Sequence, residues 1–260
     1  GFFRKIRRKL ADANKPMKYA RYAIGEIVLV VIGILIALQI NNWNEQKKAN
    51  KLEQEYYCRL LEDVEQDKEQ VEFMIKGVDN RLKAANNAVR LLHSKQTLKT
   101  EIGRELALSI NAILSDFTPN NSAFEDLKSG ANLNIIKDKN IIKAINNYFK
   151  KVEGHISIIK VNGNIALDRF FAYKDLYATG WVHQQMLGLR FEKSMEKDVH
   201  ELLQIDLEET LTDDMKYQML NDALRFISSN ARQLQLYNFI QEEADILIEL
   251  LATKCEINRD

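Results

Sequence analysis

Hydrophobic residues follow two distinct patterns along the 260-residue chain. From Tyr22 to Ile40 the sequence, YAIGEIVLVVIGILIALQI, is apolar on every side, and Glu26 is its one charged residue. Beyond Leu52 the apolar residues recur mostly at spacings of three, four or seven, with acids and lysines between them. The first pattern is typical of a helix surrounded by lipid, and the second is typical of amphipathic helices that pack on one side.

The apolar run predicts a helix that crosses a membrane, because nineteen residues span about 28 Å, close to the thickness of a bilayer core. Residues 1–21 carry eight basic side chains against the single acid Asp12, and short basic flanks stay cytoplasmic. We therefore expect a cytoplasmic segment 1–21, a transmembrane helix 22–40 and a domain 41–260 on the far side, with Trp43 at the outer interface. In a Gram-negative cell this places the chain in the inner membrane and its domain in the periplasm.

Two alternatives concern the start of the chain. A cleaved signal peptide also has basic residues before an apolar run, but this run is longer than a usual signal core and no clear A-x-A site follows it. We therefore expect the segment to be retained. Phe3, Ile6 and Leu10 recur at helical spacing among basic residues, which predicts a short helix on the anionic leaflet, ended by Pro16. The other interpretation is that these charges only set the orientation of the span.

Composition predicts an all-α fold, since the chain has only two prolines and ten glycines and is rich in good helix formers. We expect the span to continue without a break into a helix that reaches about residue 92. Further helices are predicted over 101–117, 123–128 and 141–177 and from 213 onward, and 180–209 is the least regular stretch. The expected N-caps are Thr100, Ser122, Asp138 and Thr212. A kink at Gly154 or Gly163 is as compatible with the pattern as a straight helix.

The first and last long helices are expected to pack as part of an elongated, coiled-coil-like bundle, one leading away from the membrane and the other back. Cys58 and Cys255 then lie at the same end of the bundle. A disulfide between them is one alternative, in a compartment where such bonds persist. We favour two unpaired thiols, because a slip of one or two helical turns would separate them.

Glu26 stands out because an ionisable residue at membrane depth is a candidate functional residue. Gly25, Gly33 and Ala37 are small residues at which several copies could pack closely. One interpretation places the Glu26 carboxylate in an oligomeric pore or proton path. We favour the other, in which Glu26 lies about one turn from the cytoplasmic end and meets Arg21 or basic groups of another copy.

Nothing in the sequence assembles into a recognisable reaction site. The four histidines are isolated and no Cys/His spacing suits zinc, so no metal is expected. The glycines form neither a nucleotide-binding loop nor a nucleophile elbow, so we expect no cofactor, no catalytic residue and no enzymatic activity. Acids such as Glu62, Asp63, Glu65 and Asp67 are interpreted as a solvated helix face. Nucleic-acid binding is disfavoured, because the basic cluster belongs to the membrane anchor.

Two segments carry a resemblance. FFRKIRRKL followed by YAIGEIVLVVIGILIALQINNWNE, and the later FTPNNSAFEDLKSGANLNIIKDKNIIKAINNYF, resemble hallmark segments of a family of bacterial membrane proteins known by a domain-of-unknown-function label. The resemblance implies one N-terminal span with a periplasmic helical domain, and it implies no activity. It singles out a motif of Pro119, Asn121, Ser122, Phe124, Leu127, Ser129 and Gly130. Caps and apolar side chains favour a fold element there over a contact surface.

These patterns leave several functions open. We favour a membrane-anchored periplasmic interaction or scaffold protein that self-associates or docks on an envelope complex, with the lipid bilayer as its first partner. One alternative is a subunit of a homo-oligomeric channel or ion-coupled complex, with Glu26 near the cytoplasmic mouth. Another is a sensor-like module that signals through a partner, since residues 1–21 hold no output domain.

Overall fold

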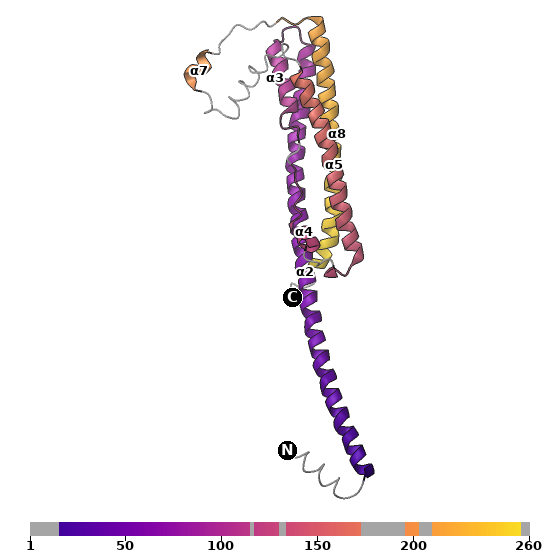
Figure 1. The fold of residues 1–260 in the computed structure, drawn as a ribbon. Coiled ribbons are helices and arrows are strands. Elements are labelled where there is room, and N and C mark those ends of the chain that lie inside the picture. The colour runs from indigo at the N-terminus through magenta and orange to yellow at the C-terminus, as the bar shows by residue number, and fades with distance from the viewer. Residues whose placement is uncertain (1–15, 115–116, 130–133, 173–195, 203–209, 256–260) are drawn as a thin grey trace. The chain divides into compact units, whose positions relative to one another are not determined.

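The computed structural model describes residues 16–114, 117–129, 134–172, 196–202 and 210–255 (Figure 1). Within these ranges all regular structure is helical, which confirms the all-α prediction. The chain divides into two compact units, residues 1–55 and 56–260. The predicted surface helix with Phe3, Ile6 and Leu10 lies outside the described residues.

The long helix α2 runs from Pro16 to Leu92 and supplies residues to both units. Its 77 residues are continuous, which confirms that the apolar segment and the amphipathic stretch form one helix. Continuity follows from composition, since no glycine or proline lies between Gly33 and Gly77 to interrupt it.

Helices α5 (Lys139–Phe171) and α8 (Asp213–Cys255) begin where their predicted caps place them. The Asp138 carboxylate accepts a hydrogen bond from the backbone N–H of Asn140 at 3.0 Å. The Thr212 hydroxyl accepts one from the N–H of Met215 at 3.2 Å. Helix α5 passes Gly154 and Gly163 without a break, and its predicted end near residue 177 lies outside the described residues. A short helix, α7 (Lys197–Leu202), lies in the stretch predicted as least regular.

Helices α3 (Lys99–Ile110) and α4 (Ser122–Ser129) correct two predicted caps and one predicted end. Leu98, rather than Thr100, precedes α3, and α3 ends seven residues before the predicted residue 117. Ser122 does not cap α4 with its own side chain. Its hydroxyl donates to the Asp63 carboxylate, and Asp63 itself accepts from the N–H of Ala123 at 2.9 Å.

Unit 2 is built on three long helical segments, α2 from Tyr56 onward, α5 and α8 (Figure 1). Helix α8 runs antiparallel to α2, because contacts with later α2 residues come from earlier α8 residues. The contacts that establish this are Cys58 with Cys255, Lys68 with Asp245, Glu72 with Gln241, and Arg81 with Asn230 and Gln233. Helix α8 is likewise antiparallel to α5, as the pairs Lys254–Asp138, Lys151–Glu243 and Arg169–Asp222 show.

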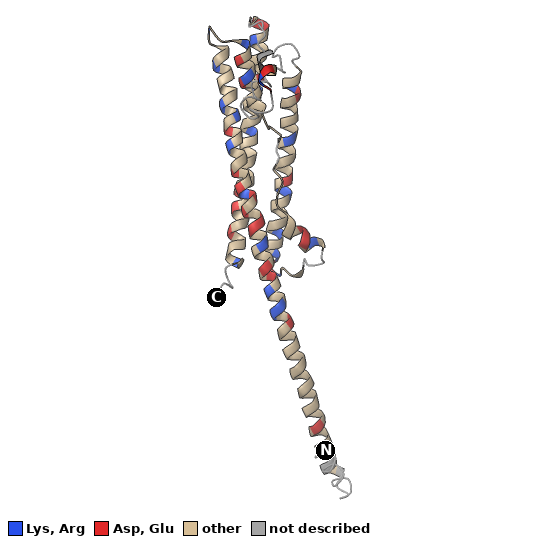
Figure 2. Ribbon diagram, turned by 90° about the vertical axis from the view of Figure 1, so that its left-hand side faces the viewer, with Lys and Arg blue, Asp and Glu red and all other residues tan. Residues whose placement is uncertain are grey.

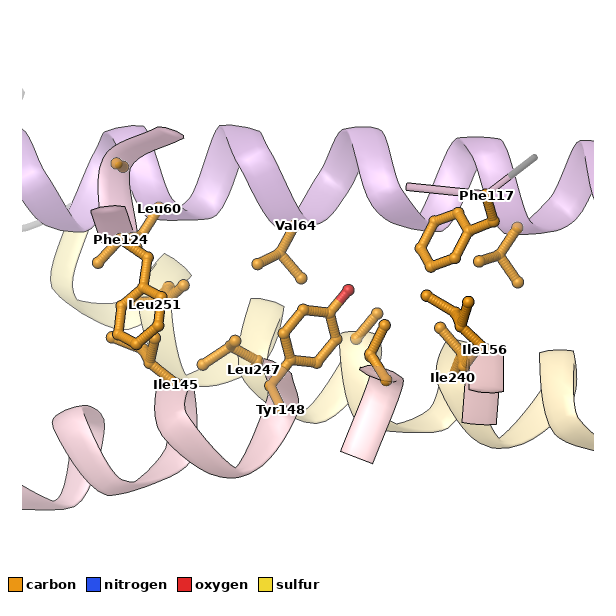
Figure 3. Close-up of a cluster of buried hydrophobic side chains, with 14 of the residues drawn as sticks. Leu60, Val64, Phe117, Phe124, Ile145, Tyr148, Ile156, Ile240, Leu247 and Leu251 are labelled. Carbon is orange, nitrogen blue, oxygen red and sulfur yellow. The ribbon is translucent and has the colours of Figure 1, made fainter. Parts of the chain in front are cut away.

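The core of unit 2 consists of two hydrophobic clusters. The larger one is formed by α2, α4, α5 and α8, and Figure 3 shows side chains such as Val64 of α2, Tyr148 of α5 and Leu247 of α8 gathered in it. The smaller one joins α3 to Ala85 and Ala88 of α2 and to parts of α5 and α8.

Between the two clusters lies a layer of buried polar side chains, which we call the polar belt. It consists of Arg81, Ser109, Asn230 and Gln233. Gly163 of α5 lies at the same level, where a Cβ atom would approach Leu114 Cδ2 to 3.0 Å and the backbone oxygen of Ile113 to 3.1 Å. Glycine therefore allows α5 to pack closely against the turn after α3, where a side chain would require its neighbours to shift.

Candidate functional site

The N-terminal part of α2 presents an apolar surface that nothing in the described chain covers. No charged residue occurs between Glu26 and Glu45, and Figure 2 shows this stretch as uncharged ribbon. The apolar side chains from Ile24 to Ile40 are 46% to 69% exposed. By length and composition this helix qualifies as a candidate membrane span, and its apolar window is not buried as a soluble core helix would be.

The residues predicted to matter for assembly all lie on this part of the helix. Gly25, Gly33 and Ala37 are exposed, and a Cβ atom at either glycine would meet no other atom within 4 Å. Glu26 is partly exposed. Trp43 is 68% exposed, and the Lys47 ammonium lies 5.6 Å from the centre of its ring. Gly25, Gly33, Ala37 and Trp43 are therefore accessible to lipid or to another protein.

Cys58 and Cys255 form a disulfide, which corrects the expectation of two unpaired thiols. Their Cα atoms lie 5.0 Å apart, within the range that a disulfide can bridge. The expectation failed because it treated the helix register as free to slip. Contacts between α2 and α8 fix that register from Lys68 with Asp245 to Arg81 with Asn230.

The motif that follows Phe117 is a fold element attached to α2 by carboxylates. Asp67, fully buried on α2, accepts hydrogen bonds from the backbone N–H of Asn120 at 2.6 Å and from its amide at 3.0 Å. Asp63, one turn earlier, binds Ser122 and Ala123 as described above. The prediction that these two acids form a solvated face is therefore wrong, because they satisfy loop and helix donors that would otherwise be unpaired.

Apolar residues hold the other side of the motif. Phe124 and Leu127 are buried, and Phe124 stacks on Phe149 with ring centres 4.7 Å apart. Pro119 is half-buried, and Asn121 and Ser122 are exposed. Gly130 lies outside the described residues. This packing agrees with the preference for a fold element, while the exposed side chains of the motif leave a contact surface as a prediction.

Asp67 has an unusual electrostatic environment. The Tyr148 hydroxyl donates a hydrogen bond to Asp67 at 2.7 Å, and Figure 3 shows this hydroxyl directed toward α2. Burial raises the pKa of Asp67 to about 6, although the hydrogen bonds from Asn120 and Tyr148 act in the opposite direction. Burial also raises the pKa of Tyr148 above its usual value, and the neighbouring carboxylate adds to this effect. Asp67 therefore changes its charge just below neutral pH.

Arg81 occupies the centre of the polar belt and is 7% exposed. Its Nε donates to the Asn230 side-chain oxygen at 2.7 Å, and Nη2 donates to that of Gln233 at 2.8 Å. Nη1 lies 3.4 Å from the backbone oxygens of Asn111 and Ala112. All these acceptors are neutral, and burial lowers the pKa of the guanidinium, which nevertheless keeps its charge at physiological pH.

The polar belt also explains why α3 ends early. The side-chain amide of Asn230 donates to the backbone oxygen of Ser109 at 2.8 Å. The side-chain amide of Gln233 donates to the backbone oxygen of Ile113 at 3.1 Å. Ala112 adopts a φ of 52°, which turns the chain out of the helix. Backbone oxygens at the end of α3 are therefore satisfied by α2 and α8 rather than by a further helical turn.

Neither Arg81 nor Asp67 was predicted from the sequence to be a buried polar residue. The signal was present, because each interrupts an apolar stripe at helical spacing, Arg81 between Val78 and Ala85 and Asp67 between Val64 and Val71.

Among the described residues no group of three or more His, Cys, Asp or Glu side chains could hold a metal ion.

These features define an all-α protein. It has a long exposed apolar helix and a helical unit linked by a disulfide. The chain belongs to a family of unknown function, DUF6090, whose model matches residues 26–169. The match covers most of α2, the polar contacts of Asp63 and Asp67, and nearly all of α5. No curated protein and no solved structure matched the chain.

Proposed function

We propose that this protein is a membrane-anchored, non-enzymatic interaction or scaffold protein. Its apolar helix 22–40 crosses the inner membrane of a Gram-negative bacterium, and its disulfide-linked helical unit lies in the periplasm. The observation that carries the proposal is the exposed apolar surface from Ile24 to Ile40, which would be costly to leave in water. Lipid is the partner that suits an apolar surface on all sides of one helix.

Two further observations support the orientation. Eight basic residues precede the span, and such flanks stay on the cytoplasmic side. The bond between Cys58 and Cys255 follows the span, and disulfides persist in the periplasm but are rare in the cytosol.

An exposed apolar stripe on α5 supports a role in protein interaction. Ile158, Val161 and Ile165 are 40%, 55% and 49% exposed and recur at spacings of three and four, so they share one face of the helix. Contact with a second copy or with an envelope protein would remove this face from water.

Cysteine labelling tests the anchoring and its orientation. Because both native cysteines are bonded, an added cysteine is the reactive one, and we would compare Lys47→Cys with Lys18→Cys in intact cells. A membrane-impermeant maleimide should label position 47 directly, whereas position 18 should react only after permeabilisation. The reverse pattern, or extraction of the chain from membranes at alkaline pH, would reject the proposal.

A channel subunit is the second candidate, favoured by Glu26 beside Gly25 on the exposed helix, with Gly33 two turns further on. A single span per chain lines a pore only when several copies gather around an axis. Native mass spectrometry in mild detergent separates the candidates. A discrete oligomer of four or more copies would favour the channel, and a monomer or dimer would remove the self-assembled pore.

A further inference from the structure

A groove of about 540 Å³ opens on unit 2 beside the polar belt, between α2 and the end of α3. We call it the Gly77 groove. Its volume lies within the range of about 300 to 1,000 Å³ that is typical of small-molecule sites. Its apolar walls include Met74 and Leu108, together with Phe73 and Leu114, which are 70% and 37% exposed. Such exposure of two large apolar side chains around a groove suits an apolar ligand.

The polar part of the groove is the Arg81 guanidinium, which contributes to its lining. Among the described residues no carboxylate forms an ion pair with Arg81, and every acceptor that it contacts is a neutral amide or backbone oxygen. The two contacts of Nη1, at 3.4 Å, are longer than a normal N–H···O hydrogen bond. Lys83 and Glu105 also line the groove with opposite charges, so that with Arg81 the lining carries a net positive charge.

Gly77 keeps the approach to this guanidinium open. A Cβ atom at this position would meet Arg81 Nη1 at 3.6 Å, an ordinary contact, so close packing does not require glycine. Glycine in the middle of a helix is less stable than alanine. What the absent side chain provides is space in the groove wall directly above Nη1.

We propose that the Gly77 groove binds a small amphipathic anion, an alkyl chain that ends in a carboxylate or phosphate group. The anionic group lies against Arg81 Nη1 and supplies the negative charge that this guanidinium lacks. The alkyl chain lies along Phe73 and Leu114 and covers them. Binding therefore requires both a negative headgroup and an apolar body.

Photoaffinity labelling of the 260-residue chain in nanodiscs would test this proposal. The probe is an octanoate analogue with an aliphatic diazirine, and labelled peptides are identified by mass spectrometry. We expect labels between residues 73 and 84 of α2 and in the turn 111–114. Competition by octanoate or by octyl phosphate should remove these labels, and the more effective of the two identifies the headgroup. Octanol should compete at least about tenfold more weakly, because it carries no charge.

Two glycine variants provide the matched comparison. Gly77→Leu fills the groove, whereas Gly154→Leu adds the same side chain to a helix position with no atom within 4 Å. Labelling at the groove should fall at least about tenfold in G77L and stay unchanged in G154L. In a third variant, Arg81→Gln, loss of labelling together with a folded circular-dichroism spectrum would support the charge requirement.

Three results would overturn the proposal. One is labelling confined to helix 22–40, another is equal competition by octanol and octanoate, and the last is unchanged labelling in G77L. If R81Q does not fold, the competition and glycine arms still decide the outcome, because neither replaces a residue of the polar belt.

Discussion

Replacing Asp67 by asparagine should remove a pH dependence of stability that burial imposes on the bundle. The folded protein keeps the proton on Asp67 up to about pH 6, whereas the unfolded chain releases it near the ordinary value of 3.8. Between these two values the folded state binds the additional proton, so its free energy of unfolding falls as the pH rises. The difference of about 2 pH units corresponds to about 3 kcal/mol, which is present at pH 4 and lost above pH 6.

The asparagine side chain is a close mimic of the protonated acid. Its oxygen can accept from Asn120, and its amide can donate to the oxygen of Tyr148, whose hydroxyl then rotates. The variant should therefore be as stable as the wild type near pH 4 and more stable at pH 7, by up to about 3 kcal/mol.

Urea unfolding followed by circular dichroism at 222 nm, at several pH values between 4 and 7.5, measures this difference. Tyr148→Phe provides the second arm. Because the lost hydroxyl stabilises the ionised form, the folded-state pKa of Asp67 should rise and the upper end of the pH window should move upward. A stability difference between wild type and D67N that stays constant across this range would refute the argument.

Two further predictions concern the disulfide and the glycines of α5. The free energy of unfolding should fall by up to about 5 kcal/mol when the bond between Cys58 and Cys255 is reduced, or when both cysteines are replaced by serine. The reason is that the bond closes a loop with a sequence separation of 197. Thermal unfolding with and without dithiothreitol measures this, and identical melting temperatures would contradict it. Gly163→Ala should destabilise by about 1 to 3 kcal/mol, since its Cβ would press on a backbone oxygen, whereas Gly154→Ala should stabilise by about 0.5 to 1 kcal/mol. Equal effects in urea titrations of the two variants would show that the close approach at position 163 is not rigid.

Most of the helical architecture was predictable because local patterns determine it. The apolar run and the periodic stripe specify α2, and Asp138 and Thr212 mark the starts of α5 and α8 through hydrogen bonds within a few residues. The candidate membrane span was likewise predictable, since its apolar character does not depend on any distant residue.

The polar contacts of the core were not predictable, because their partners are far apart in sequence. Arg81 binds side chains 149 and 152 positions away, and Asp67 binds Tyr148 at a separation of 81. A polar residue within an apolar stripe shows that something must satisfy it, but not what does. The early end of α3 and the disulfide were missed for the same reason, since both depend on how α8 aligns with α2.

The polar belt also has a consequence for how the chain assembles. Amphipathic helices with regular stripes can align in several ways that differ by one turn, about 5.4 Å. A slip of four residues would replace the two amide partners of Arg81 by Phe226 and Ser229 in one direction, or by Leu234 and Tyr237 in the other. The buried charge would then have fewer acceptors, which is unfavourable. The same slip would carry Cys255 out of reach of Cys58. Misaligned chains would thus remain reduced, and oxidation would select the molecules whose helices had already aligned.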